Sequence, residues 1–150
     1  MAIVIAVSVV VLAAIGFVAY QQFKPEKAPV QDAGYQENIE QIKSSRPADN
    51  APAQERADYY TTLGAAYASA GNNDQTITAL KQAESLYTKP SEKYGVWYGL
   101  AKAYEAKGKK KESVSYYKKA LDFAQHPPEG EEADSSLIKE LNQKIKQLGG

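Results

Sequence analysis

The stretch "WYGLAKAYEAKG" at residues 97–108 has a twin, "YTTLGAAYASAG" at residues 60–71, and the two align position for position. Each begins with an aromatic residue, has leucine at the fourth place and a small residue at the fifth, and continues with tyrosine at the eighth and glycine at the twelfth. Spacings of three and four residues place side chains on one face of a helix, and a following glycine favours the helix end. The chain therefore contains one helix-and-turn pattern twice, 37 residues apart.

Composition narrows the range of functions before any motif is considered. The 150 residues include 18 basic and 18 acidic side chains, so the chain has no net positive charge that would attract nucleic acid. The sequence has no cysteine, which excludes disulfides and thiolate metal sites. The length of the chain is enough for one domain of ordinary size and a short additional segment.

Residues 1–21 form an apolar segment in which the first 20 residues carry no charge. Twenty helical residues span ~30 Å, about the hydrocarbon thickness of a bilayer. We expect an uncleaved transmembrane anchor rather than a cleaved signal, because no basic residue precedes the apolar run and no A-x-A-like cleavage site follows it.

Two arguments about the orientation of this anchor disagree. Lys24 and Lys27 follow the apolar run, and by the positive-inside rule they would place the rest of the chain in the cytoplasm. Single N-terminal anchors, however, commonly hold their soluble domain on the other side. We expect a bacterial cytoplasmic membrane with an extracytoplasmic domain, and the orientation stays open.

Residues 22–52 have the character of a tether. The first part contains two prolines, mixed charge and no periodicity. Near 35–45, Tyr35, Ile39 and Ile42 form a narrow apolar stripe, which predicts a short helix.

The remaining residues show continuous helical periodicity and no alternation typical of strands, so we predict an all-α fold. Residues 53–125 divide into two helix–turn–helix units, about 53–88 and 91–125, and residues 126–150 form a loop and a last amphipathic helix. The residues expected to begin or cap three of these helices are Pro52, Ser91 and Asp134.

The two units resemble the tetratricopeptide repeat (TPR), a pair of antiparallel helices about 34 residues long. The positions that carry the resemblance in the first unit are Tyr60, Leu63, Gly64, Tyr67, Gly71, Ile77, Leu80 and Ala83. Those in the second unit are Trp97, Leu100, Ala101, Tyr104, Gly108, Val114, Tyr117 and Ala120. Small residues stand where helices approach closely, and large residues fill the remaining space. Thr76 and Ser113 depart from the family's small residue, and the helix-ending prolines are displaced.

The resemblance implies a helical solenoid of two repeats behind the transmembrane helix. Since a solenoid needs about three units or capping elements to bury its ends, a cap is required. The last helix, predicted at 135–148, aligns Leu141 and Ile145 with the core positions of the repeats and keeps its other face polar, as a capping helix would.

Catalysis finds little support in the sequence. His126 is the only histidine, and a metal site or catalytic triad built on it would need acidic partners from distant segments. No glycine-rich phosphate-binding loop is present. We predict that the chain is not an enzyme and has no cofactor or metal.

The resemblance implies protein binding, since TPR units commonly receive peptides in a concave groove lined by the first helix of each unit. The residues that it places at partner contacts are Thr61, Tyr98, Lys102 and Glu105. Tyr98 and Lys102, one helical turn apart, form the strongest pair. The Lys/Asn/Arg clamp that some members close on a peptide carboxylate is absent.

A lysine cluster offers a second candidate site. Lys109, Lys110 and Lys111 stand at the start of a helix, where the macrodipole disfavours cations. They form either a patch for an anion or acidic partner, or a solvated turn.

These features predict a single-pass, membrane-anchored TPR scaffold that binds a protein or peptide partner as an accessory or assembly factor of a membrane-associated complex. One alternative is a pilin-like subunit that self-assembles through its apolar N-terminal helix. Another is a chaperone-like holdase at a secretion site. Self-association of the scaffold is left open.

Overall fold

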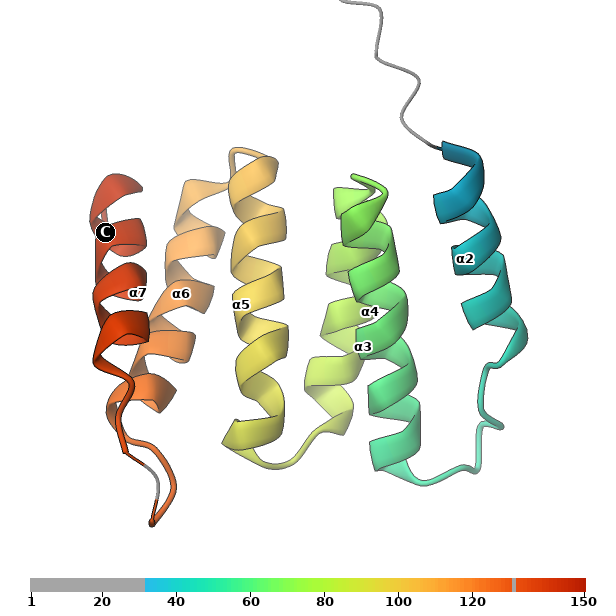
Figure 1. Ribbon diagram of the computed structural model, residues 1–150, viewed down its shortest axis with the longest axis horizontal. Coiled ribbons are helices and arrows are strands. Elements are labelled where there is room, and N and C mark those ends of the chain that lie inside the picture. Colours follow the sequence, from blue (N-terminus) through green and yellow to red (C-terminus); the bar gives the residue numbers. More distant parts are fainter. Residues whose placement is uncertain (1–31, 131) are drawn as a thin grey trace, which may run out of the picture. The chain divides into compact units, whose positions relative to one another are not determined.

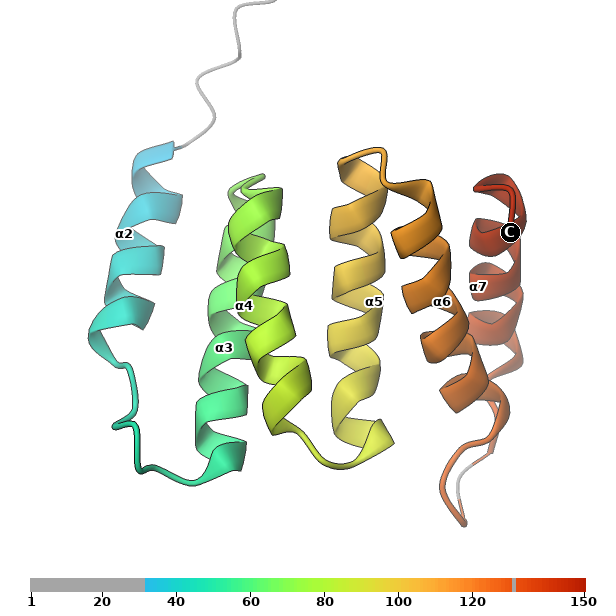
Figure 2. The ribbon, with the colours of Figure 1, turned by 180° about the vertical axis from the view of Figure 1, so that it is seen from behind.

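The computed structural model describes residues 32–130 and 132–150, and in these ranges the chain forms helices and no strand. The predicted all-α fold is confirmed for this part of the chain. The helices are α2 (Asp32–Ser44), α3 (Ala53–Ser69), α4 (Asn73–Leu86), α5 (Pro90–Ala106), α6 (Lys110–Gln125) and α7 (Ser135–Gln147). From α3 onward each helix packs against the next one in the chain (Figures 1 and 2).

Ala33–Gly150 form one compact unit. The anchor predicted at residues 1–21 lies outside the described residues and stays a prediction. Within the described ranges, no helix is both long enough and apolar enough to cross a membrane.

The twin stretches end in the same turn. Gly71 and Gly108 have φ angles of 73° and 70°, in the left-handed region that glycine adopts without steric strain. The residue after each glycine donates its N–H to the tyrosine carbonyl of the preceding helix. These bonds run from Asn72 N to Tyr67 O and from Lys109 N to Tyr104 O, both at 2.9 Å. Repetition in the sequence thus produces repetition in the backbone.

The helix starts follow local sequence in most cases. The Asp134 carboxylate caps α7 by accepting two backbone N–H groups of the first turn, at 2.9 and 3.1 Å. Pro52 directly precedes α3. The predicted cap at Ser91 is wrong, because α5 already begins at Pro90 with Lys89 as its N-cap. Proline is well suited to the first helical position, since its φ is helical and it has no N–H to satisfy.

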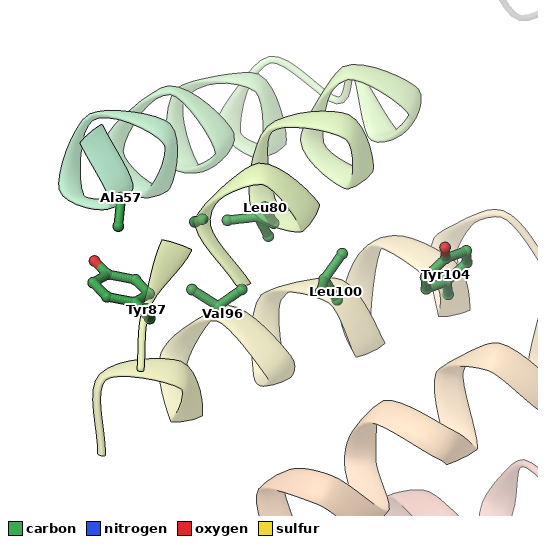
Figure 3. Close-up of a cluster of buried hydrophobic side chains, with 7 residues drawn as sticks. Ala57, Leu80, Tyr87, Val96, Leu100 and Tyr104 are labelled. Atoms are coloured by element: carbon green, nitrogen blue, oxygen red, sulfur yellow. The ribbon is translucent and has the colours of Figure 1, made fainter. Parts of the chain in front are cut away.

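One core cluster joins the two hairpins. Leu80 extends from α4 on the side that faces Val96 and Leu100 of α5 (Figure 3). The buried members of the cluster are Ala57, Leu80, Ala83, Tyr87, Val96, Leu100 and Tyr104. Because these residues come from α3, from α4 and its C-cap Tyr87, and from α5, this cluster sets how the first hairpin meets the second.

The two polar departures from the repeat pattern are fully buried and hydrogen-bonded. Thr76 Oγ1 donates to the Asn72 carbonyl at 3.0 Å, and Ser113 Oγ donates to the Ala101 carbonyl at 2.9 Å. A buried hydroxyl with a backbone partner avoids the desolvation penalty of an unpaired one, so both positions tolerate it.

Single helices cover the two ends of the hairpin pair. Ile39 of α2 is 1 % exposed and packs with Leu63 and Ala79 of the first hairpin. At the other end, Leu141 and Ile145 of α7 are buried in a cluster with residues of α5 and α6. Ile39 is the buried residue of the α2 stripe, with Tyr35 and Ile42 half-buried, and Leu141 and Ile145 are the buried residues of the α7 stripe.

Candidate functional site

A groove of about 440 Å³ runs between α3 and α5, over Leu80 of α4. Most of its lining is small side chains, with hydroxyl and amide groups and a single ionisable cation. The lining residues are Thr61, Gly64, Ala65, Ala68, Asn73, Thr76, Leu80, Gly95, Tyr98, Gly99, Lys102, Ala103 and Ala106.

Two glycines shape the floor of this groove. A Cβ built on Gly64 would lie 2.6 Å from Leu80 Cδ2, and one built on Gly99 would lie 2.8 Å from Leu80 Cδ1. Both distances are far below ordinary carbon–carbon contact. Leu80 therefore fits between α3 and α5 because both glycines lack a side chain.

The lining of the groove carries a positive charge and no negative charge. Lys102 is exposed, and no carboxylate belongs to the lining. Among the described residues Lys102 forms no ion pair, and its Nζ lies 5.7 Å from the centre of the Tyr98 ring. The groove thus offers a free ammonium group beside an aromatic face.

Three of the four predicted contact residues, Thr61, Tyr98 and Lys102, line this groove. Thr61 Oγ1 donates to the Ala57 carbonyl at 2.9 Å. Whether any of the three touches a partner stays a prediction.

Glu105, the fourth, points elsewhere. Its carboxylate accepts the Tyr117 hydroxyl at 2.7 Å and pairs with Lys144 Nζ at 3.0 Å. Burial alone would raise the pKa of Glu105, but the bonds from Tyr117 and Lys144 outweigh it and hold the pKa below its usual value. Glu105 thus links α5 to α6 and α7.

The Tyr98 hydroxyl also contacts the last helix. It donates to Glu140 Oε1 at 2.7 Å, and this bond, with burial, raises the pKa of Tyr98 to about 12. Tyr98 therefore lines the groove while its ring packs against Tyr94 and Tyr117 and its hydroxyl is held by α7.

The predicted lysine patch lies apart from the groove. Lys109, Lys110 and Lys111 are exposed at the start of α6 and none of them lines the groove. Lys109 Nζ lies 6.0 Å from the centre of the Tyr104 ring. The patch therefore stays a prediction.

A polar cluster absent from the sequence predictions joins α4 to α5 and α6. Glu84 accepts Trp97 Nε1 and Lys119 Nζ, each at 2.8 Å, and the Tyr116 hydroxyl at 3.1 Å. Burial alone would raise the pKa of Glu84, but the Lys119 and Trp97 bonds outweigh it and lower the pKa. A half-buried indole N–H needs a hydrogen-bond acceptor, so Trp97 alone could have indicated a polar partner nearby. The spacing of residues within a helix could not identify that partner as Glu84.

His126 is exposed, and its Nδ1 lies 2.9 Å from the Asp122 carbonyl of its own helix. In residues 32–130 and 132–150, no group of three His, Cys, Asp or Glu side chains is placed to hold a metal ion.

Residues 94–127 match the family model of the tetratricopeptide repeat. No curated protein and no solved structure matches the chain. The matched residues contain most of α5 and all of α6, the hairpin that carries the second of the twin stretches. Repeats of this family generally mediate contacts between proteins. The match and the helical hairpins together support a TPR-type protein.

Proposed function

We propose that this chain binds a protein partner by holding a segment of that partner in the groove between α3 and α5. The observation that carries the proposal is the groove itself, whose floor is Leu80 and whose only charged lining residue is Lys102. The proposed role involves binding and no catalytic step.

The lining indicates the chemistry of the bound segment. Small side chains at Ala65, Ala68 and Ala106 leave room for the backbone of a peptide, and the largely buried Leu80 gives the groove an apolar floor for an apolar side chain. Lys102 favours a carboxylate nearby, because an ammonium and a carboxylate form a charge-assisted hydrogen bond. The segment that fits is therefore apolar at its centre with an acidic group at one end.

We also propose that residues 1–21 anchor this module in a membrane, with the module on the extracytoplasmic side, where it serves as a scaffold or assembly factor. The uncharged run of the first 20 residues supports the anchor. The chain should stay with the membrane fraction after alkaline carbonate washing. In intact cells, added protease should digest the module; digestion only after lysis would reverse the orientation.

Site-specific photo-crosslinking tests the groove assignment. A benzophenone amino acid at Ala106, within the groove, should capture a discrete partner in the native membrane. Ala68→Arg, placed in the same groove, should abolish that product. The matched control carries the same photo-reactive group at Lys118, an exposed position of α6 outside the groove. An identical product from Lys118, or one unaffected by Ala68→Arg, would show that the partner binds elsewhere.

A further inference from the structure

A second groove lies on the other side of α3, between α3 and α2. It has a volume of about 570 Å³, and its lining residues are Asn38, Gln41, Ile42, Ser45, Thr62, Ala65, Ala66 and Ser69. Ala65 lines both this groove and the one between α3 and α5. The two grooves therefore share one lining residue, Ala65 of α3.

The second groove differs from the first in its chemistry. No charged side chain lines it, and its polar groups are amides and hydroxyls. The hydroxyls of Ser45, Thr62 and Ser69 already donate to carbonyls of their own helices or turn. The free hydrogen-bond donors of the lining are thus the two amides of α2.

Asn38 and Gln41 are three residues apart, so their side chains share one face of α2. Both side chains are exposed, and neither carboxamide is hydrogen-bonded to another described residue, although the Gln41 main-chain carbonyl accepts the Ser44 hydroxyl at 2.7 Å. A carboxamide has an NH₂ group that can donate to a peptide C=O and an oxygen that can accept from a peptide N–H. The pair is therefore suited to an extended backbone.

Building on the proposed function, we propose that α2 is part of the partner-binding surface. The partner segment that lies in the α3–α5 groove continues across Ala65 into the α2–α3 groove. There it is an extended, uncharged stretch whose backbone bonds to Asn38 and Gln41, while its acidic group lies at the Lys102 end.

The absence of charge in the lining and the distance across the two grooves both support an extended, uncharged segment as the occupant. A charged partner residue in the second groove would lose water without gaining a counter-charge, which disfavours it. Packed helices are ~8–10 Å apart, so two helix spacings from α2 to α5 measure roughly 16–20 Å. An extended chain rises ~3.3 Å per residue, so about five or six residues cross both grooves.

A selected peptide provides the probe. Peptides are selected from a random dodecapeptide library on the full-length chain in detergent, and the tightest one is labelled with fluorescein for anisotropy titration. The variants are Lys102→Ala for the first groove and the double variant Asn38→Ala, Gln41→Ala for the second. Glu37→Ala is the matched control, because Glu37 is exposed on α2 and lines neither groove.

We expect the selected peptide to carry one acidic residue and a neutral remainder, and both groove variants to weaken its binding about tenfold or more. Glu37→Ala should leave the affinity unchanged. If Lys102→Ala weakens binding while the α2 double variant stays within about twofold of wild type, the extension onto α2 is wrong and the proposed function stands. If neither variant weakens binding, or no peptide is selected, both proposals fail.

Discussion

Replacing Gly99 and Gly95 by alanine, one at a time, tests whether Leu80 requires the space that a glycine leaves. Both glycines lie in α5, four residues apart, and both line the groove. An alanine Cβ at Gly99 would lie 2.8 Å from Leu80 Cδ1, whereas one at Gly95 meets nothing within 4 Å. Leu80 has little room to move away, because its Cδ2 lies 2.6 Å from the Cβ position of Gly64.

The magnitude follows from two opposing effects. Helix propensity favours alanine over glycine by ~0.5–1 kcal/mol at either position. Overpacking a crowded site costs ~1–3 kcal/mol. We therefore expect Gly95→Ala to stabilise the fold by ~0.5–1 kcal/mol, and Gly99→Ala to be ~1–3 kcal/mol less stable than Gly95→Ala. Since propensity is the same in both variants, the difference isolates the contact with Leu80.

Guanidinium unfolding followed by far-ultraviolet circular dichroism measures the free energy of unfolding of each variant. Leu80→Ala alone should cost ~2–5 kcal/mol through the cavity it leaves. In that background, Gly99→Ala should no longer destabilise, because the atom it would strike is absent. Equal stability of Gly95→Ala and Gly99→Ala would refute the packing argument.

Three further predictions concern the links between helices. Glu84→Gln should lower the free energy of unfolding at neutral pH by ~1–3 kcal/mol, because the bond from Lys119 loses its charge partner. The pKa of Glu84 lies below its usual 4.5, so the stability that its carboxylate contributes is fully present above pH 4.5 and is lost as the pH falls through the folded-state pKa. Glu84→Gln should therefore lose less stability on acidification than the wild type does. Tyr98 should ionise near pH 12 in a tyrosinate absorbance titration, and Glu140→Gln should lower that pKa. Because the folded-state pKa of Tyr98 exceeds the usual 10.0, the stability that the protonated hydroxyl contributes is lost between pH 10 and about 12. Leu141→Ala should cost ~2–5 kcal/mol in chemical unfolding, and an unchanged midpoint would show that α7 unfolds separately.

Much of the helical framework could be predicted because its causes are local. Helical periodicity placed the hairpins, and Gly71 and Gly108 adopt the left-handed turn that a glycine at that spacing favours. The acidic cap at Asp134 formed as its sequence position predicts. Ser91 failed as a cap because Pro90, one residue earlier, is the better helix start.

The candidate site was only partly predictable. The resemblance to the tetratricopeptide repeat, counted along each first helix, was enough to put Thr61, Tyr98 and Lys102 along the groove between α3 and α5. It failed for Glu105, because the groups that bind its carboxylate come from α6 and α7. The spacing of residues within one helix says nothing about which distant side chain will meet it.

The sequence by itself determined that this chain forms paired helices, since hydrophobic period and turn glycines act over a few residues. It also determined where small side chains would let helices approach. Only the tertiary structure decided which polar side chains are used within the fold and which remain free, as Glu105 and Lys102 show. The reason is physical: hydrogen bonds and burial depend on partners far apart in the chain, and these meet only when the helices pack.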